Sequence, residues 1–246
     1  MTIRLFVEIA LAEGHEIDLP PDAARHAQVR RVQPGSLITL FDGRGQDWPA
    51  TVLDMGRHSV KVQLGAPIRI DRELPFAVTL AIGMPANERM DLLVEKATEL
   101  GAARIQPLHT ERSVLRLAGE RAERKRLHWQ AIAQAACEQC GRARVPVVAP
   151  VRALGAWLPT VGAGPHLVLS LEADARPLAV QADEIVRVGS ATTMLNGPEG
   201  GLTRDEEALA RAHGFAPTTL GPRILRADTA PLAVLAWLAL CDRNSN

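Results

Sequence analysis

Residues 194–206 read MLNGPEGGLTRDE, and this stretch is the most informative part of the chain. Its first residues are apolar and predict a buried strand, which runs into a turn with three glycines in five residues. Thr203 and Glu206 have the spacing of a capping box, so a helix is expected to begin there and to end near Gly214. A strand, a glycine turn and a helix in this order predict an α/β fold.

The glycine turn also predicts a ligand site, because glycines permit positive φ and let a ligand approach the backbone closely. No lysine follows the glycines, so the turn is not a P-loop, and its spacing differs from the G-x-G-x-x-G of dinucleotide-binding folds. Glu199, in the middle of the turn, would repel a pyrophosphate at short range. We therefore expect a neutral or cationic ligand, and the alternative is a tight turn that binds nothing.

A second unusual stretch, residues 219–231, reads TLGPRILRADTAP. Its Gly-Pro pair predicts a turn, after which Asp228 or Thr229 is positioned to cap an apolar helix over 230–240. A guanidinium beside such a helix is costly unless it is paired. Arg226 is therefore a candidate functional residue.

The chain is predicted to form two domains, 1–72 and 73–246. The first is β-rich, because short apolar runs alternate with turns that contain glycine and proline, as in a small β-barrel. After Pro75 the pattern changes to alternating strands and helices. Expected strands of the second domain are 76–83, 105–108, 166–171 and 192–195, and expected helices are one capped by Asn87, one over 120–140 and one over 230–240.

Charge is distributed unevenly, although 28 Lys and Arg residues balance 28 Asp and Glu residues. Residues 104–152 hold ten basic and four acidic residues, and Arg121, Arg124 and Lys125 share one face of the expected helix 120–140. A local basic surface predicts a polyanionic partner such as RNA, and the alternative is a solvated helix face. Because aromatic residues make up only 3% of the chain, a base-stacking platform is not expected.

Cysteine use indicates a reducing compartment. Three cysteines (Cys137, Cys140 and Cys241) cannot form a disulfide framework, so we expect a cytoplasmic protein. Cys137 and Cys140 form a C-x-x-C pair, which we interpret as two small helix residues, and no metal site is expected. No apolar run approaches the ~20 residues of a membrane helix, and the N-terminus lacks the pattern of a signal peptide.

Three stretches, in their order and spacing, resemble the bacterial 16S rRNA (uracil-N3)-methyltransferases of the SPOUT superfamily. They are KATELG at 96–101 with ERS at 111–113, residues 136–146, and residues 196–202 with 220–230. The resemblance implies an RNA-binding, PUA-like N-terminal β-barrel followed by a SPOUT α/β methyltransferase domain with a C-terminal trefoil knot. It also implies the cofactor S-adenosyl-L-methionine (SAM), 16S rRNA of the 30S ribosomal subunit as partner, a role in ribosome biogenesis, and a homodimer.

The resemblance assigns residues of this sequence to the site. The implied cofactor-binding residues are Leu195, Asn196, Gly197, Pro198, Glu199, Gly200, Gly201, Leu220, Gly221, Ile224, Leu225 and Arg226. The candidate RNA-binding residues are Arg25, Arg30, Arg31, Arg112, Arg121, Arg124, Lys125 and Arg142. The sequence departs from the family pattern at Asn196, where an aliphatic residue is usual, and at Ala227-Asp228, where Thr-Glu is more usual.

The expected reaction is in-line methyl transfer from the sulfonium of SAM to N3 of a uridine. Because N3 of neutral uridine carries a proton, a base must remove it or the anion must be stabilised. Glu199 and Asp228 are the candidate bases, and Arg226 is the candidate for stabilising charge on the uracil oxygens. The alternatives are a non-catalytic RNA-binding protein and a SPOUT methyltransferase that acts on another RNA.

Overall fold

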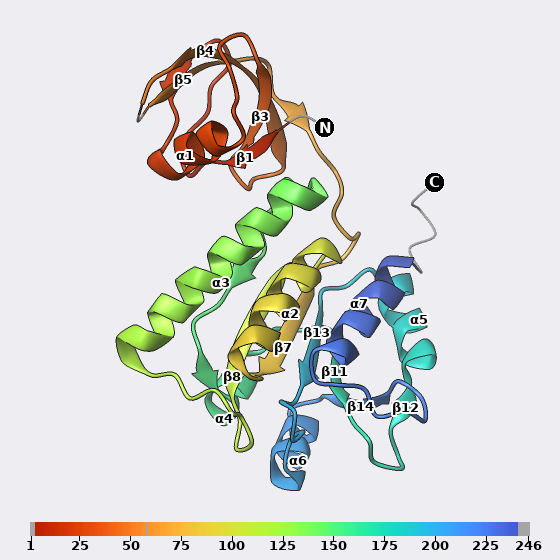
Figure 1. Cartoon of the computed structure of the whole chain (residues 1–246). Coiled ribbons are helices and arrows are strands. Elements are labelled where there is room, and N and C mark those ends of the chain that lie inside the picture. The colour runs from red at the N-terminus through yellow and green to blue at the C-terminus, as the bar shows by residue number, and fades with distance from the viewer. Residues whose placement is uncertain (1–2, 58, 241–246) are drawn as a thin grey trace. The chain divides into compact units, whose positions relative to one another are not determined.

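The computed structural model describes residues 3–57 and 59–240, which divide into two compact units of mixed α/β structure. The N-terminal unit comprises the residues up to Glu73 and the segment Gln134–Val145. The second unit comprises Leu74–Ala133 and the residues from Pro146 onward. The long helix α3, Gly119–Cys140, therefore contributes residues to both units (Figure 1).

The N-terminal unit is built on a six-stranded sheet with the order β1-β3-β4-β5-β2, in which β6 pairs with β4. It also contains helix α1, Pro21–Val29, which the sequence analysis does not predict. The buried face of α1 consists of Ala23, Ala24 and Ala27, whose small side chains give a weak helical signal. The strands are β1 (Arg4–Phe6), β2 (Glu16–Asp18), β3 (Leu37–Phe41), β4 (Gln46–Met55), β5 (Val60–Leu64) and β6 (Ile68–Arg69).

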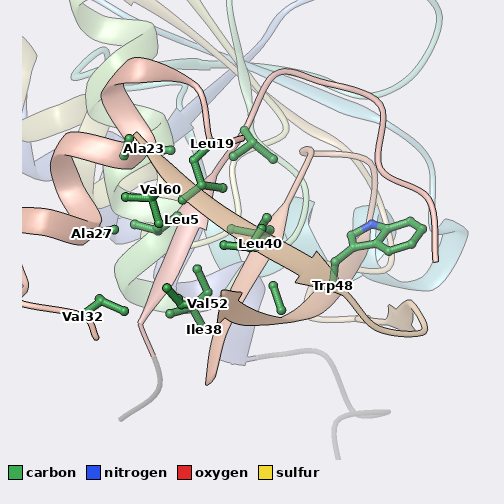
Figure 2. Packing of buried hydrophobic residues seen from close by; sticks show 14 of the residues in the cluster. Leu5, Leu19, Ala23, Ala27, Val32, Ile38, Leu40, Trp48, Val52 and Val60 are labelled. Carbon is green, nitrogen blue, oxygen red and sulfur yellow. The ribbon is translucent and has the colours of Figure 1, made fainter. Parts of the chain in front are cut away.

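The core of this unit follows from strand alternation. In β5, Val60, Val62 and Leu64 are buried whereas Lys61 and Gln63 are exposed, because successive side chains of a strand point to opposite faces of the sheet. Residues from the helix and the other strands pack on the same cluster, among them Leu5, Leu19, Ala23, Ala27, Val32, Ile38, Leu40, Trp48 and Val52 (Figure 2).

Within the N-terminal unit, Arg4 binds the end of α3 to the sheet. Its Nη1 donates to the carbonyl oxygen of Cys137 at 2.7 Å, and its Nη2 pairs with the Asp47 carboxylate at 2.6 Å. Arg142, just after α3, is 3% exposed and ion-paired with Glu73. Breaking a buried pair would leave an uncompensated charge, so the predicted RNA contact of Arg142 is corrected to a structural role.

The second unit contains an eight-stranded sheet whose strand pairs are all parallel. The order is β10-β8-β7-β13-β11-β14-β12, and β9 pairs with β8. The four predicted strands of this unit are confirmed as β7, β8, β11 and β13, whereas β14 is not predicted. The strands are β7 (Val78–Gly83), β8 (Arg104–His109), β9 (Val147–Val148), β10 (Arg152–Ala153), β11 (His166–Leu169), β12 (Arg176–Pro177), β13 (Thr192–Asn196) and β14 (Ala216–Thr219).

Helices pack on this sheet, as parallel strands with crossover connections require (Figure 1). Helix α7 contacts α2, α5 and β13, and helices α4 and α6 contact each other. Ala81 of β7 and Leu195 of β13 pack in one cluster with residues of α4 and α6. The helices are α2 (Asn87–Glu99), α4 (Leu154–Trp157), α5 (Leu178–Val188), α6 (Arg204–Ala212) and α7 (Thr229–Leu240), with a short 3₁₀ helix at Leu158–Thr160.

The ends of two helices test the predicted caps. Helix α6 begins with the predicted capping box: the N–H of Glu206 donates to Thr203 Oγ1 at 3.2 Å, and the N–H of Thr203 donates to the Glu206 carboxylate at 3.0 Å. At α2 the predicted cap is wrong, because Ala86 is the N-cap residue and Asn87 is the first residue of the helix.

Candidate functional site

A cavity of about 510 Å³ lies at the carboxyl ends of β11, β13 and β14. Two loops form most of its lining: residues 196–202 after β13, here called the glycine loop, and residues 220–227 after β14, here called the arginine loop. The rest of the wall comes from Leu169–Leu171 at the end of β11, Thr218 of β14, Ala230 of α7 and Arg89 of α2. Ligands of parallel α/β sheets bind at this edge, and the volume is that of a small-molecule site.

The predicted cofactor-binding residues come together at this cavity, apart from Leu195. Leu195 is fully buried in the cluster beneath the sheet, so it supports the glycine loop without facing the cavity. Arg89, Ser170, Thr218 and Arg223 also line the cavity, although the sequence analysis does not name them. The predicted residues in the lining are Asn196, Gly197, Pro198, Glu199, Gly200, Gly201, Leu220, Gly221, Ile224, Leu225 and Arg226.

The glycine loop is folded so tightly that Gly197 has no room for a side chain. A Cβ at this position would lie 2.6 Å from backbone atoms of Gly201 and Leu202. The carbonyl oxygen of Pro198 accepts the N–H of Gly201 at 2.8 Å, and Gly201 has a φ of +69° that favours glycine. A Cβ at Gly83, the last residue of β7, would meet Pro198 Cδ at 2.7 Å. The backbone of this loop is therefore fixed before any ligand arrives.

Glu199 supplies negative charge to the lining. Its Oε1 accepts the N–H of Ala86 at 3.1 Å and lies 3.8 Å from Arg89 Nε. Ala86 is the N-cap of α2, where the helix dipole favours an anion. The carboxylate is held by these two partners at the cavity, which Arg223 and Arg226 also line, so the expectation of a neutral or cationic ligand stays a prediction.

The two other candidate catalytic residues differ in position. Arg226 is exposed and lines the cavity, and its carbonyl oxygen accepts the N–H groups of Thr229 and Ala230 at the start of α7, both at 3.0 Å. Asp228 is outside the lining of the cavity. Its Oδ1 accepts the N–H of Thr229 at 3.1 Å, which is a helix-start contact. The catalytic role of Asp228 stays a prediction.

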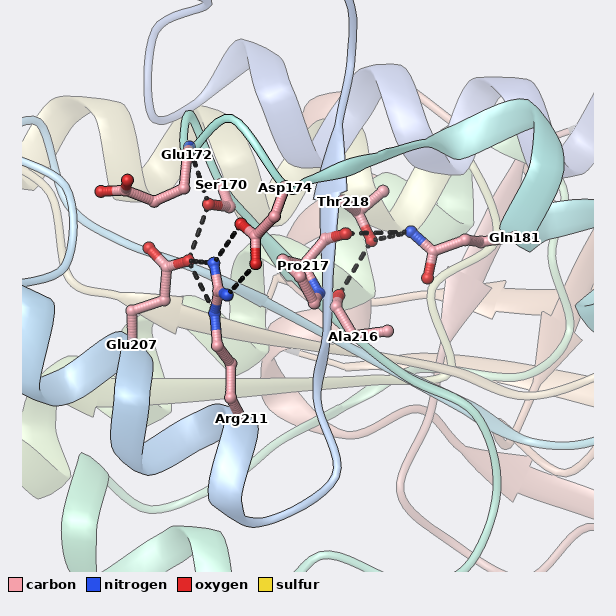
Figure 3. A network of polar contacts seen from close by, with 9 residues as sticks. All are labelled: Ser170, Glu172, Asp174, Gln181, Glu207, Arg211, Ala216, Pro217 and Thr218. Atoms are coloured by element: carbon pink, nitrogen blue, oxygen red, sulfur yellow. Dashed lines mark hydrogen bonds and ion pairs between the residues drawn. The ribbon is translucent and has the colours of Figure 1, made fainter.

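A polar network holds the wall at the end of β11 (Figure 3). Ser170 Oγ donates to Glu207 Oε1 at 2.7 Å, and Arg211 pairs with both Glu207 and Asp174 at 2.6 Å. The hydrogen bonds from Arg211 lower the pKa of Asp174, and the two carboxylates raise the pKa of Arg211. Ser170 is thereby fixed in the cavity wall; its position directly after a buried strand is the signal that could have identified it.

Thr218 is fixed in the same way from the neighbouring strand. Gln181 of α5 donates to Thr218 Oγ1 at 2.8 Å, and Thr218 Oγ1 donates to the carbonyl oxygen of Ala216 at 3.0 Å (Figure 3). Thr218 has no clear signal in the sequence, because Pro217 interrupts the strand pattern of β14.

The predicted RNA-binding residues of the second unit fall into different environments. Arg121 and Arg124 are exposed on α3. Lys125 Nζ lies 3.9 Å from Asp91, a carboxylate that His128 also contacts at 2.8 Å. Lys125 is therefore already paired, so the basic face is smaller than the sequence suggests.

The remaining candidates are Arg112 and three arginines of the N-terminal unit. Arg112 Nη1 donates to the carbonyl oxygens of Gly200 at 2.7 Å and Leu202 at 3.3 Å, so it contacts the glycine loop. Arg25, Arg30 and Arg31 are exposed on or just after α1.

Residues 3–57 and 59–240 lack the features of two other classes of site. Among them, no group of three or more His, Cys, Asp or Glu side chains is arranged to hold a metal ion. No helix in the same part of the chain has the length and apolar character needed to cross a membrane.

Two protein families match this chain. The family described as the RNA methyltransferase domain matches residues 72–239, and the family described as the RNA methyltransferase PUA domain matches residues 19–65. The chain belongs to this RNA methyltransferase family. The two matches confirm the family predicted from the sequence and the PUA-like N-terminal fold of this RNA methyltransferase.

Two curated relatives of this RNA methyltransferase carry the name ribosomal RNA small subunit methyltransferase E. The relative from Synechocystis sp. is 37% identical over 214 residues, which cover 86% of this chain and 68% of the relative. The relative from Bacillus subtilis is 30% identical over 245 residues, which cover 96% of this chain and 95% of the relative.

Solved structures resemble the whole chain of this RNA methyltransferase. A methyltransferase from Legionella pneumophila in complex with SAM superposes with a TM-score of 0.91 at 32% identity, over 98% of both chains. The ribosomal RNA small subunit methyltransferase E of Neisseria gonorrhoeae bound to S-adenosyl methionine has a TM-score of 0.89 at 34% identity, again over 98% of both chains.

Proposed function

We propose that this RNA methyltransferase transfers a methyl group from SAM to N3 of a uridine in 16S rRNA of the small ribosomal subunit. The observation that carries the proposal is the cavity at the carboxyl ends of β11, β13 and β14, framed by the glycine loop and the arginine loop. The names of the curated relatives support the rRNA substrate class, and the solved relatives with SAM support the cofactor.

The residues of the cavity fit SAM. Glu199 offers a carboxylate to a cationic sulfonium, and a Cβ at Gly201 or Gly221 would meet no atom within 4 Å, so a ligand has room to approach the backbone at these two positions. Leu171 and Ile224 line the cavity although they are 72% and 81% exposed, so apolar surface is available to a planar base. Ser170 and Thr218 are buried and hydrogen-bonded within the protein, so they fix the shape of the cavity wall.

When bound, SAM would supply an electrophilic methyl group, whose bond to the sulfonium sulfur would break with its electron pair left on sulfur as a neutral thioether. As the new bond to N3 forms, the N3 proton must pass to a base, and charge develops on the uracil oxygens if the proton leaves first. We assign Arg226 to the stabilisation of that charge, because it is an exposed cation among the residues that line the cavity. Glu199 and Asp228 are the proposed bases; Oε1 of Glu199 is engaged by Ala86 and Arg89, whereas Asp228 makes its hydrogen bond to the adjacent Thr229.

The same proposal includes the RNA-contacting residues, the cellular location, the knot and the oligomeric state. We propose that rRNA contacts the exposed arginines Arg25, Arg30 and Arg31 of one unit and Arg121 and Arg124 of the other. The cytoplasmic location, the trefoil knot and the homodimer implied by the family resemblance also belong to it. Sedimentation at micromolar concentration should give twice the mass of one chain; a fully active monomer would contradict the dimer.

Three outcomes separate the proposal from its alternatives. Incubation with SAM and unmodified 30S subunits, followed by mass spectrometry of the rRNA, should locate one new methyl group on N3 of a uridine. A non-catalytic RNA-binding protein would not bind SAM in calorimetry. A methyltransferase for another RNA would bind SAM but leave the 30S subunit unmethylated.

Replacement of Arg226 tests the catalytic assignment. Arg226→Ala should lower turnover roughly 10²- to 10³-fold, the effect of removing one donor to a developing anion. Its affinity for SAM should change far less, because the loop backbone supplies most of the cofactor contacts in this proposal. Turnover equal to that of the unchanged enzyme would remove Arg226 from the mechanism.

A further inference from the structure

The turn that follows β8 is rigid. The N–H of Thr110 donates to Ser113 Oγ at 3.0 Å, and the N–H of Ser113 donates to the carbonyl oxygen of Thr110 at 3.1 Å. The two hydroxyl oxygens lie 2.9 Å apart, and both residues are buried. Arg112 lies between these two residues in sequence, so its backbone belongs to a turn that is stabilised by its own hydrogen bonds.

From this turn Arg112 reaches the glycine loop. Its Nη1 donates to the carbonyl oxygens of Gly200 and Leu202, at 2.7 Å and 3.3 Å. The stem of the side chain covers Gly200 closely: a Cβ at Gly200 would lie 3.2 Å from Arg112 Cδ and 3.3 Å from Arg112 Cβ. Gly200 does not have a positive φ, so it is this contact that leaves no free space for a side chain.

A second contact joins the same turn to the first turn of α6, directly after the glycine loop. Oε1 of Glu206 accepts the N–H of Glu111 at 2.8 Å, while Oε2 of the same carboxylate accepts the N–H of Thr203 at 3.0 Å. Glu206 therefore has a partner outside its own capping box. Arg112 therefore contacts the glycine loop itself, and Glu111 contacts the start of the helix that follows it.

We propose that Arg112 is a positioning residue that holds Gly200–Leu202 in the conformation that binds the cofactor, and that it is not a phosphate contact. The inference rests on the proposed binding of SAM at this cavity. A guanidinium that donates to backbone carbonyls stabilises one loop conformation, and a loop that is ordered in advance binds its ligand without the entropic cost of ordering. The charge of Arg112 is secondary to its geometry.

Two substitutions separate geometry from charge. Arg112→Lys keeps the charge, but an ammonium on a shorter stem does not reproduce the contacts of the guanidinium. Arg112→Met removes the charge and keeps most of the stem. Both variants should bind SAM about tenfold or more weakly in calorimetry without RNA, the scale of one lost hydrogen bond from a charged donor. In turnover assays, KM for SAM should rise more than kcat falls.

Binding to 30S subunits should not respond to these substitutions, in contrast to SAM binding. Affinity for 30S subunits, and its slope against salt, should stay unchanged in both Arg112 variants. The exposed Arg121 of α3 is the matched control, and Arg121→Met should show the reverse pattern: unchanged SAM affinity and a salt slope lower by about 0.7–0.9. Weaker RNA binding with unchanged SAM affinity in Arg112→Met would overturn the inference in favour of a phosphate contact.

Gly200→Ala tests the contact between Gly200 and Arg112 from the other residue. The new Cβ would press on the Arg112 stem without changing any charge. SAM affinity should fall in this variant, with an unfolding midpoint close to that of the unchanged protein. Full SAM affinity in both Gly200→Ala and Arg112→Met would overturn the inference. If the unchanged protein itself binds no SAM, it is the proposed function that fails.

Discussion

Nδ2 of Asn196 lies 2.8 Å from the carbonyl oxygen of Ala227 and donates a hydrogen bond to it. The same amide donates to the carbonyl oxygen of Gly197 at 2.9 Å. Asn196 and Ala227 are 6% and 8% exposed, so the bond is shielded from water. Since Asn196 begins the glycine loop and Ala227 ends the arginine loop, one side chain joins the two loops that frame the cavity. It also fixes the residue that follows Arg226.

Removing the Asn196 amide should lower the stability of the protein. Asn196→Leu restores the aliphatic character usual in the resembled family but leaves the buried carbonyl of Ala227 without this donor, so the free energy of unfolding should fall by about 1–3 kcal/mol. Asn196→Asp should cost more, because a carboxylate would face two carbonyl oxygens. Urea unfolding of the three proteins checks the order. Equal stability of Asn196→Asp and the unchanged protein would contradict it.

Part of the site could be predicted because its signals are local in sequence. The capping box of Thr203 and Glu206 needs only a spacing of three residues, and the structure reproduces it. The strand and the glycines that precede the capping box also lie within a few residues of it. By contrast, the partner of Asn196 is 31 residues away, and nothing near either residue indicates the contact.

The elements that were missed have weak or interrupted patterns. Helix α1 buries only alanines, and β14 contains Pro217, which removes a backbone donor. The sign of a residue's charge is a weak predictor of an RNA contact in this chain. Arg112 and Arg142 look like RNA contacts by sign, yet one donates to loop carbonyls and the other is buried beside Glu73. Sequence reveals that an arginine is present, whereas its partner depends on the fold.

Gly197→Ala should abolish the cofactor site. The added Cβ would lie 2.6 Å from the backbone of Gly201 and Leu202, which cannot move aside as a flexible side chain can, so the glycine loop must open. We expect SAM affinity to fall by at least about tenfold, or 1.4 kcal/mol, in calorimetry. Gly155→Ala is the matched control, because its Cβ would make only an ordinary contact with Leu209 at 3.7 Å. Full affinity in Gly197→Ala would show that the loop is not the cofactor site.

Cys137 should be chemically inert in the folded protein. A hydrogen bond with Cys140 and burial raise the pKa of the Cys137 thiol well above its usual range. Because only the thiolate is a nucleophile, iodoacetamide at pH 8 should leave Cys137 unmodified in native protein and label it in urea, as mass spectrometry of the peptide would show. Rapid labelling of the native protein would contradict this and revive a reactive role for the C-x-x-C pair.

The same shift predicts a pH dependence of stability. Above about pH 8.5 the unfolded chain loses the Cys137 proton whereas the folded chain keeps it, so the folded state binds more protons. The free energy of unfolding should therefore fall as pH rises above this value. Urea unfolding at pH 7 and pH 10 should show a smaller fall in Cys137→Ala than in the unchanged protein, and an equal fall would argue against the shift.

The exposed face of α3 gives the last prediction. If Arg121 and Arg124 contact phosphates, reversing both to Glu should lower the slope of log affinity for 30S subunits against log salt by about 1.4–1.8 units. Lys125 is left unchanged, because a glutamate there would face Asp91 and disturb the contact between α3 and α2. SAM affinity should not change in the double variant, since α3 does not line the cavity.

Arg187→Glu, an exposed charge reversal on α5, controls for net charge alone. A general electrostatic effect would lower RNA affinity in both proteins in proportion to the charge added, whereas specific phosphate contacts would change the salt slope only in the α3 variant. If the double variant binds 30S subunits with unchanged affinity and slope, the α3 face is solvated surface. We then expect the RNA path to run over Arg25, Arg30 and Arg31, and reversing those three charges should lower the affinity for 30S subunits.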